Sequence, residues 1–183
     1  INNDGKIDVV AAWATAGSVG QISILIGNGN GTFSRGTTLT AGGIISSASL
    51  RDIDNDGDLD ILVSDETNSS VNIQLGNGNG TFSVGTTLTL GGAPSSTSAP
   101  VMVDLNEDGK IDIVQNYSGG IAIRLGNGNG TFETTSTLTS AGTHDSSPLI
   151  TDINSDGDLD IVQNNISTSD VSVFLGNANG TFS

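Results

Sequence analysis

Acidic and amide side chains recur at alternate positions in short, glycine-containing segments of this chain. The clearest segment runs from Asp52 to Asp60, with Asp at positions 1, 3, 5 and 9 and Gly57 at position 6. Oxygens placed at alternate positions around a sharp turn suit Ca²⁺, which accepts a flexible cage of roughly six to eight oxygen ligands. Mg²⁺ demands stricter octahedral geometry, and these segments lack the His and Cys ligands that zinc and copper prefer. We therefore expect calcium in each segment.

Four segments share this plan, three of them complete and one that lacks the Asp of position 1. Position 7 needs only its backbone carbonyl, so its side chain can be Asp or Lys. The expected ligands are Asn2, Asp4, Lys6 and Asp8; Asp52, Asp54, Asp56, Asp58 and Asp60; Asp104, Asn106, Asp108, Lys110 and Asp112; and Asp152, Asn154, Asp156, Asp158 and Asp160. We expect one calcium ion per repeat, about four in all.

Two other interpretations of these loops were compared with a calcium site. Asp-rich turns can be metal-free Asx turns, but clustered carboxylates without a cation repel one another. An EF-hand needs a Glu at position 12 and flanking helices, whereas position 12 here is Val63, Gln115 or Gln163 inside a β-rich run. We expect structural calcium loops that lead into strands, rather than sensors or catalytic centres.

The elements that carry these loops repeat with a period of roughly 50 residues, which is typical of propeller blades. The run GNGNGTF at residues 27–33 recurs at 76–82 and 126–132, and residues 176–182 read GNANGTF. A segment that alternates apolar and polar residues precedes each run, as in Val71, Ile73 and Leu75. With the β-rich segments around the loops, each repeat offers four strands and no helical periodicity.

The combination of DxDxDGxxD, a hydrophobic strand and LGNGNGTF resembles the FG-GAP or VCBS-type repeat, which is similar to the calcium-loop blades of integrin alpha-subunit heads and of secreted bacterial proteins. The resemblance spans essentially the whole chain. It implies an all-β fold of propeller-type blades, each with four antiparallel strands and calcium in a hairpin between its first and second strands. We place the repeats at residues 1–51, 52–103, 104–151 and 152–183, in one continuous domain. We expect these four repeats to be a fragment of a larger propeller or an open array or fibre.

Charge and composition limit the classes of partner that this chain could bind. The formal net charge is -15, and 15 of the 20 acidic residues lie in the four loops, so four calcium ions would bring the charge to -15 + 8 = -7. Five scattered basic residues make no patch for nucleic acid, and no apolar stretch is long enough to insert into a membrane. The chain has no Cys, so metal rather than disulfides would stabilise it.

Other residues could bind a ligand or carry a modification. Trp13 and Tyr117 could stack on a sugar, although solitary aromatics more often cap a core. The sequence also satisfies the N-glycosylation pattern at Asn68, Asn116 and Asn165. The GNGNGTF runs satisfy it too, but the φ > 0 needs of a tight turn explain their Asn and Gly residues more simply. The single histidine, His144, lies in the run THDSSP beside Asp145, where a catalytic pairing would need a nucleophile in a shaped cleft. Since the sequence has no nucleophile elbow, no phosphate loop and no acid pair outside the calcium loops, we expect no enzyme.

Three functions remain open at this stage. The first is a secreted or surface-exposed calcium-binding structural or adhesive module, whose partners could be other copies of itself in an end-to-end assembly. Weak calcium loops fit this location because extracellular calcium is abundant. The second is a lectin-like or protein-binding propeller that uses the loops at residues 15–20, 66–70, 118–120 and 166–170. The third is an accessory propeller of a larger secreted enzyme.

Overall fold

The computed structural model describes residues 1–13, 19–94, 98–134, 136–140 and 146–183, and His144 and most of the loop at 15–20 lie outside these ranges. The described residues form strands and turns, with no helix that could cross a membrane. Consecutive strands pair to build four sheets in chain order. The sheets contain β1 (Val9–Trp13), β2 (Gln21–Gly27) and β3 (Phe33–Thr40); β4 (Ile45–Arg51), β5 (Asp60–Asp65), β6 (Ser70–Gly76) and β7 (Phe82–Thr89); β8 (Val101–Val103), β9 (Asp112–Tyr117), β10 (Gly120–Arg124) and β11 (Ser136–Leu138); and β12 (Leu149–Thr151), β13 (Asp160–Asn165) and β14 (Asp170–Phe174). A short hairpin of β15 (Gly176–Asn177) and β16 (Thr181–Phe182) follows the last sheet.

All pairings are antiparallel, and each sheet is a meander of sequence neighbours. Each acidic loop of the last three repeats joins the strand before it to the strand after it, as Asp52 to Leu59 joins β4 to β5. The sheets therefore begin one strand before the loops, at β4, β8 and β12, whereas the sequence repeats were delimited at the loops. The expected all-β fold of antiparallel, propeller-type sheets is confirmed, with four strands in the second and third sheets and three in the first and fourth.

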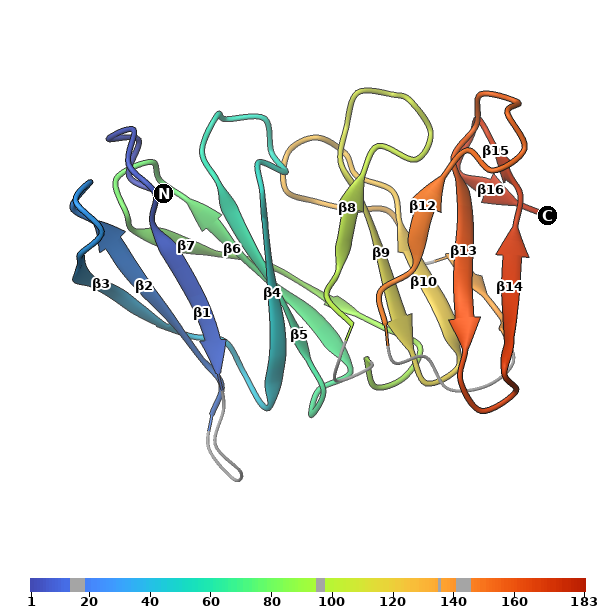
Figure 1. Ribbon diagram of the computed structural model, residues 1–183, viewed down its shortest axis with the longest axis horizontal. Coiled ribbons are helices and arrows are strands. Elements are labelled where there is room, and N and C mark those ends of the chain that lie inside the picture. Colours follow the sequence, from blue (N-terminus) through green and yellow to red (C-terminus); the bar gives the residue numbers. More distant parts are fainter. Residues whose placement is uncertain (14–18, 95–97, 135, 141–145) are drawn as a thin grey trace.

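The sheets stack in a row, and their apolar residues form one core between each pair of neighbours (Figure 1). The alternation of β5 explains this arrangement, because Ile61 and Val63 face the first sheet whereas Leu62 faces the third. On β6, Val71 and Ile73 pack into the core with the third sheet. The inner strand β5 is thus buried on both faces.

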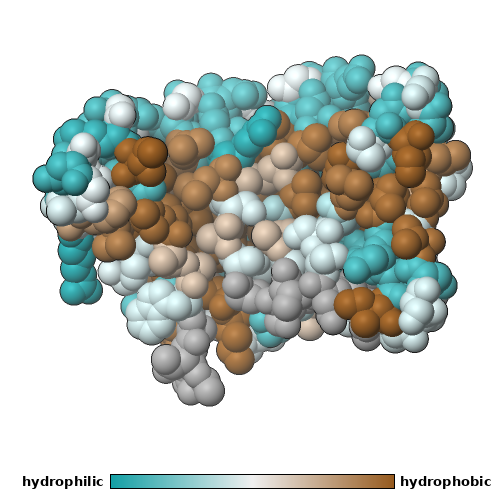
Figure 2. Space-filling view, viewed as in Figure 1, coloured by the Kyte–Doolittle hydropathy of each residue, from teal (hydrophilic) through white to brown (hydrophobic). Residues whose placement is uncertain are grey.

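The four acidic loops lie along one edge of this row, the upper edge in Figure 1. In the same orientation, hydrophilic side chains gather along that edge above a band of hydrophobic side chains over the sheets (Figure 2). The geometry of the repeats thus brings the charged groups to one rim and leaves the stacked faces apolar.

The GNGNGTF runs fold as tight turns on the same rim. In the second repeat, Gly78 and Gly80 have φ of 66° and 82°, a region that favours glycine. The Asn79 side-chain oxygen accepts hydrogen bonds from the Thr81 N–H at 3.0 Å and the Thr81 hydroxyl at 2.6 Å. The same pair of bonds recurs at Asn30, Asn129 and Asn179. The turn chemistry expected of these runs is confirmed.

Candidate metal centre

The aspartate at position 9 of each loop is buried at the start of a strand and ties the loop to the glycine-rich turn. Asp60 has no exposed surface, and its two oxygens accept hydrogen bonds from Ile53 N–H and Gly76 N–H, both at 2.8 Å. The corresponding oxygens of the later repeats make the same two contacts, from Leu105 and Gly126 to Asp112 and from Ile153 and Gly176 to Asp160. In the first loop, Asp8 accepts from Gly27 N–H at 2.7 Å, and the Ile1 nitrogen lies 3.0 Å from its other oxygen.

Within the second loop, the backbone wraps around the carboxylates of positions 1, 3 and 5. Asn55 and Gly57 have φ of 62° and 91°, which reverses the chain between these positions. Gly57 N–H donates to Asp52 at 3.0 Å, and Asp58 N–H donates to Asp56 at 2.8 Å. Equivalent bonds from position 6 to position 1 join Gly109 to Asp104 and Gly157 to Asp152. All three complete loops therefore share one conformation.

Carboxylates of the second loop converge on a common point. One oxygen from each of Asp52, Asp54 and Asp60 lies within 4.8 Å of the others. The Oδ1 atom of Asp52 is buried and has no hydrogen-bonding partner within the described part of the chain. A buried carboxylate oxygen without a partner carries a desolvation cost that a coordinated cation removes. These residues fit a hard divalent cation, and the carbonyl of Asp58 stands next in the loop order.

The pKa shifts of the position-9 aspartates in the two inner loops also fit a cation site. Burial, followed by the neighbouring charges of Asp54 and Asp56, raises the pKa of Asp60 to about 6 despite its two backbone hydrogen bonds. Burial likewise raises the pKa of Asp112. In the fourth loop, the hydrogen bonds from Gly176 and Ile153 outweigh burial, and they lower the pKa of Asp160. A cation beside Asp60 would reverse its shift, because opposite charge favours the ionised form.

The lysines at position 7 pair with the aspartate at position 5, which is itself an expected ligand. In the third loop, the Lys110 ammonium pairs with Asp108 at 2.9 Å, which lowers the pKa of that carboxyl. Lys6 pairs with Asp4 at 3.3 Å in the first loop. Both pairs are partly exposed, and a cation in either loop would compete with the ammonium for the carboxylate at position 5.

The two aromatic residues considered for sugar stacking do not meet. Trp13, at the end of β1, is 46 % exposed, and its indole N–H donates to Ser23 at 3.2 Å. The ring of Tyr117, at the end of β9, lies against Gly91, Gly92 and Gly119, where an added Cβ would come within 2.6–3.2 Å of it. Tyr117 therefore packs between turns, and only Trp13 offers an open aromatic face.

The expectation of N-glycosylation does not fit two of its three positions. Asn116 has no exposed surface, and its Nδ2 donates to the Ser146 carbonyl at 2.6 Å and to Gln163 at 2.7 Å. Asn165 is 2 % exposed, and its Nδ2 donates to Asp170 at 2.7 Å. A glycan would have to replace these bonds inside the fold. Asn68 is exposed, although its Nδ2 donates to Asp65 at 2.7 Å.

Sequence reasoning missed the role of the residues at positions 12 and 13. The Gln115 amide oxygen accepts from the Ser64 hydroxyl of the preceding sheet at 3.0 Å, as Gln163 accepts from Asn116. Both glutamines are fully buried. The available signal was a Gln that replaces an apolar residue in a strand otherwise rich in Ile and Val. These amides join neighbouring sheets rather than bind metal.

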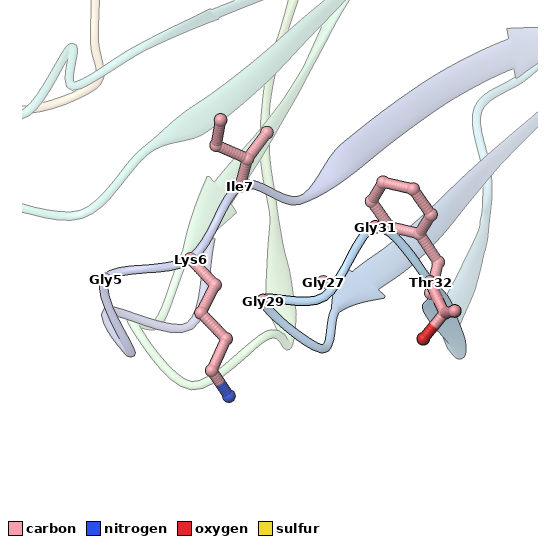
Figure 3. Close-up of a pocket in the computed structure, with 8 residues that line it drawn as sticks. Gly5, Lys6, Ile7, Gly27, Gly29, Gly31 and Thr32 are labelled. Carbon is pink, nitrogen blue, oxygen red and sulfur yellow. The ribbon is translucent and has the colours of Figure 1, made fainter.

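A pocket of about 510 Å³ lies between the first acidic loop and the first glycine-rich turn, lined by Gly5, Lys6, Ile7, Gly27, Gly29, Gly31, Thr32 and Phe33 (Figure 3). No carboxylate lines it. In the later repeats, the equivalents of Gly31 are covered by an aliphatic side chain of the preceding sheet: Ile26 lies beside Gly80, Leu75 beside Gly130 and Leu125 beside Gly180. The pocket is therefore the surface on which sheets stack, not a second metal centre.

Comparison with known proteins places this arrangement in context. The model of the FG-GAP-like repeat family matches residues 1–63, 52–115 and 104–163. No curated protein matches the chain. Among solved structures, the chain is similar to an Agrocybe aegerita lectin that specifically recognises non-reducing terminal N-acetylglucosamine, with 20 % sequence identity and a TM-score of 0.59. That likeness covers 98 % of this chain and 52 % of the lectin chain, so the sequence spans about half the length of the structure it matches.

Proposed function

This chain belongs to the FG-GAP-like repeat family, and on that premise we propose that it is a non-enzymatic calcium-binding module that acts outside the cell or on its surface. Calcium in the acidic loops fixes the rim of each sheet, and the stacked sheets form a structural or adhesive unit. The observation that carries the proposal is the convergence of Asp52, Asp54 and Asp60 within 4.8 Å.

Calcium would supply the positive charge that this rim lacks. The ligands in the second loop would be carboxylates of Asp52, Asp54, Asp56 and Asp60 with the carbonyl of Asp58. Asp60 would then link metal to fold, because its oxygens also hold Ile53 and Gly76 N–H. A loop closed in this way stabilises the β4–β5 hairpin, since ion binding to the folded state alone adds to folding free energy.

An extracellular setting follows from the expected affinity. Acidic loops of this kind, which have no bidentate Glu and are open to water on one side, suit extracellular calcium at about millimolar levels. Cytosolic calcium would leave such sites largely empty, and the carboxylates of the rim would repel one another.

Calorimetric calcium titration of two alanine variants tests the proposal. Asp52→Ala removes a converging ligand, whereas Asp58→Ala removes the same charge from a side chain whose carbonyl alone is needed. We expect Asp52→Ala to bind one calcium ion fewer per chain and Asp58→Ala to keep the full number. Equal stoichiometry in the two variants, or no heat of binding in the unmodified chain, would refute calcium binding at this loop.

A second candidate function is glycan binding. It is supported by the structural likeness to a lectin that recognises terminal N-acetylglucosamine and by the open face of Trp13. A lectin-like role is compatible with the calcium proposal, because the metal loops and the turns at the far ends of the strands lie on opposite edges of the sheets. Binding of the chain to an immobilised glycan array, and its loss in Trp13→Ala, tests this candidate.

A further inference from the structure

A second hollow, of about 250 Å³, opens between the first and second sheets, on the side of the strands away from the acidic loops. Its walls come from the β5–β6 hairpin, from β7 and from the segment Thr40 to Gly42 that follows β3. The side chains on these walls include Asp65, Ser70, Asn72, Gln74, Val84 and Thr87. On β6, the three polar ones alternate with core residues, so they share the face turned toward the first sheet.

One wall of the hollow is held in place by a closed set of hydrogen bonds. Asp65 is fully buried and accepts from Gly43 N–H at 2.9 Å. Asn72 donates from Nδ2 to the Ala41 carbonyl at 2.9 Å and to Asp65 at 3.3 Å. The Thr87 hydroxyl donates to the Asn72 oxygen at 3.0 Å. These contacts cross from one sheet to the next, so the wall is preformed rather than assembled around a ligand.

Two other groups in the hollow are left without protein partners. The Ser70 hydroxyl belongs to a residue that is 2 % exposed, and its oxygen makes no hydrogen bond within the described residues. Gln74 is 6 % exposed, and none of the hydrogen bonds found among those residues involves its side-chain amide. A polar group buried without a partner costs on the order of 1–3 kcal/mol. The Ser70 oxygen is enclosed by protein, so only the Gln74 amide can take a partner from the hollow itself.

Within the described residues, the positions equivalent to the polar wall of this hollow carry different side chains in the later sheets. In the third sheet, β10 carries Ala122 and Arg124 at the places of Asn72 and Gln74, and the Arg124 guanidinium donates to the carbonyls of Thr89 and Glu133. In the fourth sheet, Ser172 occupies the place of Asn72 and accepts from Asn165 at 2.8 Å. The equivalent groups elsewhere are thus bonded to protein, and a structural need of the repeat does not explain the free amide of Gln74.

We propose that this hollow binds one residue of a neutral saccharide, which is held by the Gln74 amide. Sugar hydroxyls donate and accept at once, as does a carboxamide, so the unpartnered amide of Gln74 becomes satisfied. Val84 at the rim is 84 % exposed and gives the C–H face of a sugar ring an apolar contact.

The same walls exclude charged ligands. The Asp65 carboxylate repels anions, as does the net charge of -15. A cation would have to displace the N–H donors of Gly43, Asn68 and Asn72 that already hold the oxygens of Asp65. The site deepens the glycan-binding candidate above, and it does not depend on calcium because none of its residues belongs to an acidic loop.

Saturation-transfer NMR with glucose, galactose, mannose and N-acetylglucosamine as separate probes tests the assignment. We expect millimolar binding of at least one sugar, a shift of the Gln74 side-chain NH₂ signals, and an affinity loss of about tenfold in Gln74→Leu. Gln21→Leu is the matched control, because Gln21 lies at the place of Ser70 on β2, outside the hollow. Circular dichroism and thermal unfolding of each variant establish that it folds, and Val84→Asp, which removes the apolar contact at the rim, provides a second test if Gln74→Leu does not fold.

Each contrary outcome has a distinct meaning. Absence of transfer from all four sugars overturns the proposal and leaves water as the partner of Gln74. Binding that survives Gln74→Leu but is lost in Trp13→Ala overturns this site while preserving a glycan-binding function elsewhere. Binding that persists in EDTA supports a saccharide site that does not need calcium, whether or not the calcium proposal is correct.

Discussion

At the scale of single residues, Asp60 is subject to two opposing effects in the metal-free loop. Its two backbone hydrogen bonds favour the carboxylate, yet burial and the nearby charges of Asp54 and Asp56 disfavour that charge and raise its pKa to about 6. A calcium ion resolves the conflict, since it favours the ionised form and neutralises the neighbours at once.

The raised pKa of Asp60 gives calcium binding a pH dependence. Because the folded pKa of about 6 lies above the unfolded value of 3.8, the proton on Asp60 stabilises the metal-free fold. That contribution is complete below pH 3.8 and is lost as the pH rises through 6. Calcium competes with this proton, so affinity at the second loop should fall by up to about tenfold per pH unit below 6. Calcium titrations of the chain at pH 5, 6 and 7 measure this fall in affinity. An affinity independent of pH would show that Asp60 is not a ligand.

At the scale of elements, the glycine that opens each GNGNGTF turn makes the loop and the turn fit together. A Cβ on Gly76 would lie 2.4 Å from the carbonyl oxygen of Leu59. A Cβ on the equivalent glycines 27, 126 and 176 would lie 2.0–2.2 Å from the corresponding carbonyl oxygen of its own repeat. The N–H of Gly76 must also reach Asp60 at 2.8 Å. Only a residue without a side chain allows this approach, so the acidic loop and the glycine-rich turn are one unit separated in sequence.

This fit predicts the effect of adding a methyl group. Gly76→Ala should cost about 3 kcal/mol in the free energy of unfolding, because backbone must move and the bond to Asp60 is strained. Gly31→Ala is the matched control: Gly31 has φ of 84° but open space around it, so only the backbone conformation is penalised, by about 1–2 kcal/mol. Urea unfolding of both variants in calcium compares them, and equal costs would contradict the proposed close packing of loop and turn.

Much of this element structure was predictable from sequence, and the exceptions have physical reasons. The alternation of Val71, Ile73 and Leu75 predicted a strand with one core face, and Asn-Gly pairs predicted tight turns. The same alternation could not tell that Ser70 and Gln74, on the opposite face, are covered by the neighbouring sheet. Nor could the pattern at Asn116 reveal burial, because a glycosylation motif describes local sequence whereas burial depends on the next sheet. The convergence of three loop carboxylates followed from spacing alone, since the loop is local.

At the scale of the whole molecule, one sheet stacks on the next through apolar cores and, at two of the three junctions, through buried amides. Gln115 accepts from Ser64 and donates to the Ser98 carbonyl at 3.2 Å. At the first junction, the residues at the corresponding positions are Ala12 and Val63, which pack in an apolar cluster instead. The two kinds of junction hold the same stacking, so a polar pair is not required for it. Its removal from one side only is costly, because a buried hydroxyl or carbonyl then lacks a partner.

A double-mutant cycle converts one kind of junction into the other. Gln115→Val alone should destabilise the chain by about 2 kcal/mol, because Ser64 loses the nearer of its two acceptors and the Ser98 carbonyl loses a donor. Adding Ser64→Ala reproduces the Ala12 and Val63 pair of the first junction, so the double variant should be more stable than the sum of the single costs by about 1 kcal/mol. Thermal unfolding in calcium and in EDTA measures the coupling. A coupling present in both conditions means that the buried amides join the sheets independently of the metal loops. Strictly additive costs would instead show that Gln115 and Ser64 do not stabilise the junction as a pair.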